Sequence, residues 1–197
     1  PASGAEIITN REFILAGTAE PETQLTEEDV ALMVNIAWYH LSEAEKMQIN
    51  DLSPTGKANL VRQFWRDQDD DPSNPENPVY DEAVLRYKYA NENFSTNRAM
   101  DNGWKTDRGR VYITYGPYDE REEEVMTGKT YPYILWEYYQ LEGGCIFVFV
   151  NDYVAGAVDY RLVHSTHPRE KYDPSWQSRL ESDESQDSWR DPGDPDY

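Results

Sequence analysis

The stretch Asp101-Asn-Gly-Trp-Lys-Thr-Asp-Arg-Gly-Arg-Val-Tyr-Ile-Thr-Tyr-Gly116 divides the chain into two parts. Segments before it have apolar residues at helical spacing, whereas most segments after it are short and rich in aromatic and β-branched residues. At the changeover, residues 103–107 combine a glycine, a large aromatic, a hydroxyl and a carboxylate. Helices followed by strands are typical of an α+β fold, which is the class we expect.

About three helices are expected before this stretch. The first begins after Thr26, is restarted or bent by the capping-box pattern at Ser42, and runs to about residue 51. The second covers about 54–66, because Ser53-Pro54 is typical of a helix start. The third covers about 79–94, and its apolar stripe is Tyr80, Val84, Tyr87 and Phe94.

Four strands are expected after the third helix, at 110–115, 132–139, 145–150 and 160–165. Residues 117–130 are rich in charge and are predicted to form a loop, and Gly143-Gly144 is predicted to form a turn. Consecutive antiparallel strands joined by short connections form a meander, and we expect the helices to pack on one of its faces.

The two ends of the chain are predicted to be extended. Residues 1–24 are interpreted as an N-terminal arm, residues 25–166 as the α+β domain, and residues 167–197 as an acidic extended or disordered tail. The tail has two interpretations: it is solvated, or it lays its widely spaced aromatic residues onto its own surface or onto that of another protein.

Composition limits the classes of partner. The 197 residues carry a net charge of −20 from 38 acidic and 18 basic side chains, which argues against binding to nucleic acid or to anionic lipid. This charge fits a well-solvated surface, a cationic partner or divalent cations. No apolar run is long enough to span a membrane, and no signal-peptide pattern is present.

Cys145, the only cysteine, lies in an apolar run and is predicted to be a buried, inert thiol.

Residues 40–166 resemble the GWxTD domain family, a bacterial family without an established activity. The resemblance rests on Gly103-Trp-Lys-Thr-Asp107 with the following Arg108-Gly-Arg-Val-Tyr112, on Tyr115-Gly-Pro117, and on Tyr160-Arg-Leu162. It implies a bacterial origin and an extracellular or cell-envelope location, but it supplies no reaction.

The residues around the signature have a structural and a functional interpretation. In the structural one, Gly103 permits a tight backbone, Trp104 locks helix to sheet, and Thr106 and Asp107 bind turn amides. In the functional one, aromatic, acidic and basic side chains line a cleft for a sugar or a peptide. The residues of this candidate binding site are Trp104, Thr106, Asp107, Arg108, Arg110 and Trp136.

The acidic loop after the second helix is a candidate for a calcium site. Asp67, Asp69 and Asp71 offer hard oxygen ligands, but the loop does not follow the EF-hand pattern, and a solvated loop is the alternative. No other cofactor is indicated, and no constellation of catalytic residues stands out among the 38 acidic side chains.

Three functions remain open from the sequence. The first is a non-catalytic protein-interaction or assembly module, with a protein partner or self-association. The second is a sugar- or peptide-binding module that uses the Gly103–Arg110 corner. The third is an enzyme of unknown class that uses carboxylates.

Overall fold

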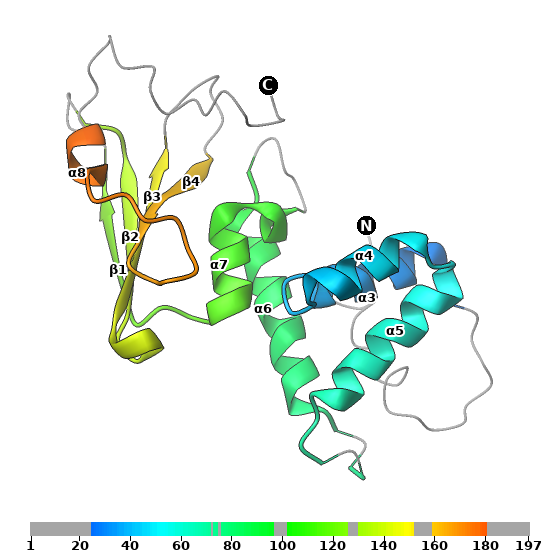
Figure 1. The fold of residues 1–197 in the computed structure, drawn as a ribbon. Helices are drawn as coiled ribbons and strands as arrows, with labels where there is room; N and C mark the ends of the chain where they lie inside the picture. Colours follow the sequence, from blue (N-terminus) through cyan, green and yellow to red (C-terminus); the bar gives the residue numbers. More distant parts are fainter. Residues whose placement is uncertain are drawn as a thin grey trace. The chain divides into compact units, whose positions relative to one another are not determined.

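The computed structural model describes residues 25–71, 73–74, 76–96, 102–125, 130–151 and 159–180. Within these residues, helices precede a four-stranded antiparallel sheet, so the α+β class is confirmed (Figure 1). The chain divides into two compact units, Pro1–Leu85 and Arg86–Tyr197, and the boundary falls inside helix α6 (Pro78–Phe94). None of the described helices combines the length and the apolar character that a membrane crossing needs. The predicted arm at 1–24 lies outside the described residues, as does the end of the predicted tail from residue 181.

The first unit contains α3 (Glu27–Ala37), α4 (Glu43–Asp51), α5 (Pro54–Asp67) and the start of α6. Each of the first three helices begins at the residue that the sequence predicts. The hydroxyls of Thr26, Ser42 and Ser53 accept hydrogen bonds from backbone N–H groups in the first turn of their helices. These bonds satisfy amides that have no partner inside the helix.

The core of this unit forms where α3 packs against α5. Trp65 is its largest side chain, is 2% exposed, and has the rings of His40 and Tyr80 edge-on at 5.4 and 5.5 Å. Asn77 connects α5 to α6: its Nδ2 donates to the carbonyl of Trp65 (2.8 Å), and its Oδ1 accepts from the N–H of Tyr80 (2.9 Å).

The second unit contains the rest of α6, the short helix η1 (Gly103–Lys105), α7 (Asp107–Tyr115) and the sheet. The strands are β1 (Glu120–Glu124), β2 (Tyr133–Tyr138), β3 (Cys145–Asn151) and β4 (Tyr160–Ser165), in the order β1-β2-β3-β4. The short helix η2 (Leu141–Gly143) connects β2 to β3, and Gly143 and Gly144 there have φ of +82° and +113°. The last helix that the structure describes is α8 (Trp176–Arg179).

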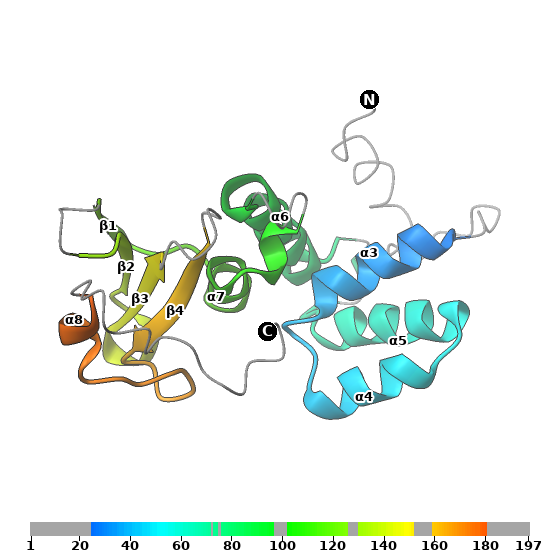
Figure 2. The same cartoon turned by 90° about the horizontal axis from the view of Figure 1, so that it is seen from above.

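The prediction of a strand at 110–115 is wrong, because these residues belong to α7. Val111 and Ile113 are both fully buried, and this alternation resembled a strand. Residues two positions apart on a helix lie about 200° apart around its axis, so a helix covered on two sides buries both. Figure 2 shows α7 between α6 and the sheet.

The prediction of a loop over 117–130 is also incorrect, because β1 lies within it. The sequence Glu-Arg-Glu-Glu-Glu is poor in residues that favour strands. It is extended here because its backbone pairs with β2, from Glu120 opposite Glu137 to Glu124 opposite Tyr133. The meander is therefore shifted by one segment: β1 replaces the expected first strand.

Both faces of the sheet carry buried residues. On its helix face, Ile134, Trp136 and Phe149 are buried, and the ring of Trp136 packs with those of Phe94 on α6 and Tyr112 on α7. On the opposite face, which we call the tail face, Val148, Val150 and Val163 pack against Leu180 of the C-terminal segment. Trp176 and Leu180 of the C-terminal segment thus lie against this face, and the carbonyl of Leu180 accepts a hydrogen bond from the N–H of Tyr131 (3.0 Å).

Candidate functional site

The turn at Gly103 and Trp104 presses closely on α6. The N–H of Gly103 donates to Ser95 Oγ (3.2 Å) and that of Trp104 to Asn91 Oδ1 (3.2 Å). A Cβ on Gly103 would lie 2.2 Å from the carbonyl oxygen of Ala90, so only glycine fits. The indole of Trp104 is 6% exposed and lies 5.8 Å from the ring of Tyr87. These contacts make Trp104 a packing residue of the second unit.

Thr106 starts α7. Its Oγ1 donates to the carbonyl of Gly103 (2.8 Å) and accepts from the N–H of Gly109 (3.1 Å). Both hydrogen-bonding functions of the hydroxyl are thus used inside the motif, and they fix η1 against the first turn of the helix.

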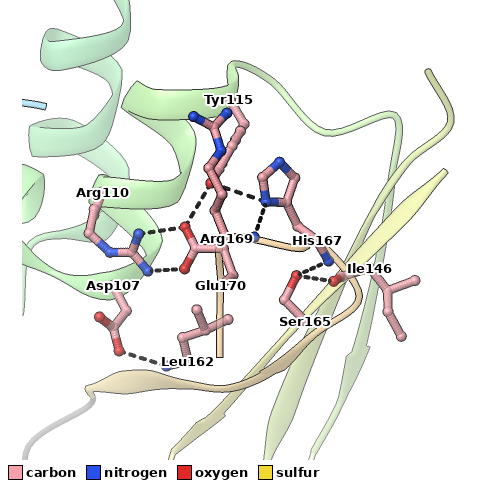
Figure 3. Close-up of polar contacts among 9 residues, drawn as sticks. All are labelled: Asp107, Arg110, Tyr115, Ile146, Leu162, Ser165, His167, Arg169 and Glu170. Atoms are coloured by element: carbon pink, nitrogen blue, oxygen red, sulfur yellow. Dashed lines mark hydrogen bonds and ion pairs between the residues drawn. The ribbon is translucent and has the colours of Figure 1, made fainter. Parts of the chain in front are cut away.

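Asp107 connects α7 to the sheet. Its Oδ2 accepts a hydrogen bond of 2.7 Å from the N–H of Leu162 on β4 (Figure 3). That amide points away from β3, and the carboxylate covers it. The bond therefore satisfies a donor on the outer edge of β4 that would otherwise remain exposed.

Arg108 is held by aromatic rings. Its guanidinium carbon lies 5.2 Å from the ring centre of Phe94 and 4.6 Å from that of Tyr160. Burial lowers the pKa of Arg108, while Tyr160 and Asp159 act in the opposite direction. Phe94 also contacts Trp136, so the structure brings these two predicted site residues, Arg108 and Trp136, to the same aromatic cluster.

Arg110 is directed toward Glu170 in the C-terminal segment. Its Nη1 and Nη2 donate to the two carboxylate oxygens at 2.7 and 2.8 Å, and the hydroxyl of Tyr115 donates to Oε1 at 2.8 Å (Figure 3). The side chain of Glu170 is 8% exposed. Burial alone would raise the pKa of Glu170, but the hydrogen bonds from Arg110 and Tyr115 outweigh it and hold that pKa below its usual value.

The other groups of this cluster are also bonded. Burial, and then the hydrogen bond to Glu170, raise the pKa of Tyr115, and its protonated hydroxyl acts as the donor in that bond. Ser165 Oγ donates to the carbonyl of Ile146 (2.8 Å) and accepts from the N–H of His167 (3.0 Å). The serine proton therefore points to a backbone carbonyl and away from any base.

His167 and His164 both hold the C-terminal segment through Nδ1. His167 Nδ1 accepts from the N–H of Arg169 (3.2 Å), and His164 Nδ1 accepts from the N–H of Asp173 (3.0 Å). The ring of His164 also stacks on Trp176. Because Nδ1 accepts in each case, a neutral ring carries its proton on Nε2. These histidines act as hydrogen-bond acceptors for the backbone.

The sequence did not identify Glu170, Tyr115, Ser165 and His167 as members of one cluster. Glu170 lies 60 residues after Arg110, in a segment without periodicity, and Tyr115 was assigned to a strand. No local pattern marks such a pairing, because it depends on where the chain returns after β4.

The candidate calcium ligands each bond local donors. Asp67 Oδ1 accepts from Gln63 Nε2 (2.6 Å), Asp69 Oδ1 from the N–H of Asp71 (3.1 Å), and Asp71 Oδ1 from the N–H of Ser73 (3.3 Å). In the part of the chain that the structure describes, no group of three or more His, Cys, Asp or Glu side chains is placed to hold a metal ion. Cys145 is buried, and its burial raises the pKa of the thiol.

The geometry defines an α+β domain in which the Gly103–Arg110 segment joins α6, α7, β4 and the C-terminal segment. The sequence model of the GWxTD domain matches residues 15–185, and the chain therefore belongs to the GWxTD domain family. No curated protein and no solved structure matches the chain.

Proposed function

We propose that this chain is a non-catalytic protein-interaction or assembly module of a bacterial cell-envelope or secreted protein. The observation that carries the proposal is the use of the signature for internal contacts. Thr106, Asp107 and Arg110 bond Gly109, Leu162 and Glu170, and Trp104 is buried. The envelope or secreted location rests on the family resemblance alone.

The chemistry of the buried cluster supports the same conclusion. Nucleophilic catalysis needs a hydroxyl or thiol that is activated by a base. The Ser165 hydroxyl donates to a carbonyl, the pKa of Tyr115 is raised, and the pKa of the Cys145 thiol is raised as well. Each group is thus held in its unreactive, protonated form.

A first test is the mass in solution, measured by light scattering after size exclusion over a hundredfold range of concentration. An assembly module gives a mass that rises with concentration. A constant protomer mass contradicts self-assembly and restricts the proposal to a different protein as partner. The same measurement with added calcium shows whether calcium, for which the acidic loop is the candidate site, changes the mass.

A second candidate is a sugar- or peptide-binding module next to Arg108. It is favoured by the half-buried rings of Tyr89 and Tyr112, which stack at 4.4 Å, and of Tyr118, which stacks on Trp136 at 4.7 Å. Partly accessible aromatic rings beside an arginine suit such ligands.

Tryptophan fluorescence during titration with chitotetraose or cellotetraose tests this candidate. Binding that Tyr118→Ala removes, and that Tyr172→Ala retains, supports it; Tyr172 is a matched control because it is 69% exposed. If both variants and the native chain give the same fluorescence change with the oligosaccharide, a sugar site at these rings is excluded.

A further inference from the structure

The two edges of the sheet differ in what covers them. On the edge formed by β4, the N–H of Leu162 donates to Asp107 (2.7 Å), and the N–H of Ser165 donates to the carbonyl of Lys171 (2.7 Å). On the other edge, β1 pairs with β2 alone among the strands that the structure describes. Figure 1 shows β1 at the outside of the sheet. An edge strand of this kind presents backbone N–H and C=O groups that another chain can pair with.

The side chains of β1 are arranged by charge. All five are exposed. Glu120, Glu122 and Glu124 lie opposite Glu137, Leu135 and Tyr133, and therefore project from the tail face of the sheet. Nothing basic lies opposite them on β2.

The one basic residue of β1, Arg121, projects from the helix face of the sheet. Arg121 lies opposite Trp136 and Glu123 opposite Ile134, and Arg121 Nη2 bonds Glu123 Oε2 at 2.6 Å. Because this pair neutralises itself, the charge that has no basic neighbour on β1 or β2 is the row of alternate glutamates on the tail face.

We propose that the edge of β1 that faces away from β2 binds an extended, basic segment of another protein as a fifth strand, with Lys or Arg at every second position. The backbone of the segment pairs with β1, and its basic side chains lie beside Glu120, Glu122 and Glu124. This inference rests on the proposed function as an interaction module and names the chemistry of the partner.

The same arrangement disfavours a second copy of this chain. Pairing β1 with β1 would place glutamates next to glutamates, and each chain carries a net charge of −20. Charged edge strands often serve only to prevent such pairing. An edge that only prevents pairing and an edge that binds a partner differ in one respect. Only the binding edge holds a basic strand in a defined register.

The probe is a ten-residue fluorescein-labelled peptide that alternates Lys and Thr, measured by anisotropy at about 50 and 150 mM salt. We expect saturable binding that weakens several-fold at the higher salt. A peptide of the same composition with its lysines in one block should bind at least fivefold more weakly, because a strand places only alternate residues on one face.

Backbone methylation separates strand pairing from charge attraction. Two versions of the alternating peptide carry N-methyl groups on the odd or on the even amides. In strand addition one set faces β1 and the other faces solvent, so one version should lose binding and the other retain it. Equal binding by both versions, or by the alternating and block peptides, would overturn the proposal.

Matched variants locate the site. Glu122→Gln with Glu124→Gln should weaken peptide binding by roughly five- to tenfold, as expected for two exposed ion pairs. Asp51→Asn with Glu76→Gln, both exposed and in the first unit, changes the net charge equally and should alter binding less than twofold. Hydrogen exchange of amides in Glu120–Glu124 should slow with peptide bound.

The outcomes distinguish the two proposals. If the peptide does not bind, or binds equally well to both double variants, the proposal about β1 is wrong. A mass that rises with concentration would then still support the interaction module through another surface. If neither peptide binding nor assembly occurs, the proposal about β1 fails and self-assembly fails with it, which restricts the interaction module to a different protein bound at another surface.

Discussion

The carboxylate of Glu170 accepts hydrogen bonds from two residues of α7, Arg110 and Tyr115, that precede it by 60 and 55 positions. A buried carboxylate is stable only when it is paired and hydrogen-bonded, and here both conditions hold. The value of this residue to the fold can be measured directly.

Glu170→Gln should lower the free energy of unfolding by about 2 kcal/mol, because it leaves the guanidinium of Arg110 without its charged bidentate partner. Urea unfolding measures the change. The control is Glu123→Gln, which breaks the exposed pair with Arg121 and should cost less than about 1 kcal/mol. Equal losses in the two variants would contradict a special role for the buried pair.

The pH dependence of stability should report the same residue. The pKa of Glu170 is lower in the folded chain than the usual value of about 4.3 in the unfolded chain. Its contribution is therefore complete above about pH 5 and is lost as the pH falls through the folded pKa. The difference in unfolding free energy between the native chain and Glu170→Gln should shrink from pH 6 to pH 3, and a constant difference would argue against this linkage.

At the scale of elements, α7 is the segment that sequence reasoning assigned incorrectly. A helix that is buried on two sides loses the single apolar stripe by which helices are recognised. Thr106 caps the start of this helix, and Gly109 allows it to approach η1 closely. A Cβ on Gly109 would lie 2.0 Å from the carbonyl oxygen of Gly103.

Gly109→Ala should therefore destabilise the chain by about 2–3 kcal/mol, even though alanine favours helices, because the backbone of η1 must move. Gly56→Ala is the matched control in α5: its nearest neighbours are side-chain atoms of Leu52 at 3.2 Å, which can shift. We expect that change to stay within about 1 kcal/mol. Thermal and urea unfolding compare the two; a neutral Gly109→Ala would remove the argument from close approach.

At the scale of the whole molecule, the net charge of −20 opposes compaction. The acidic loop and the acidic strand β1 belong to different units, so the charge is not confined to one site.

Raising NaCl from about 20 to about 300 mM should therefore raise the melting temperature by a few degrees, since salt screens repulsion between exposed carboxylates. A fall in the melting temperature would mean that salt weakens stabilising ion pairs more than it weakens the repulsion. CaCl2 at equal ionic strength should add nothing more, because Asp67, Asp69 and Asp71 each bond local donors. An extra rise that Asp69→Asn with Asp71→Asn abolishes would instead establish a calcium site.

The sequence by itself determined whatever depends on neighbouring residues. The capped starts at Thr26, Ser42 and Ser53, the glycine turn at 143–144, and the strands at β2, β3 and β4 follow from local bonding and from periodicity. The tertiary structure alone decided the helical state of α7, the strand state of β1, and the pairing of Arg110 with Glu170. Those three depend on partners distant in the sequence: a second packed side, a neighbouring strand, and a returning segment. Burial and hydrogen bonding between residues distant in the sequence outweigh local preference. The pattern of residues along one chain does not indicate which distant residues will meet.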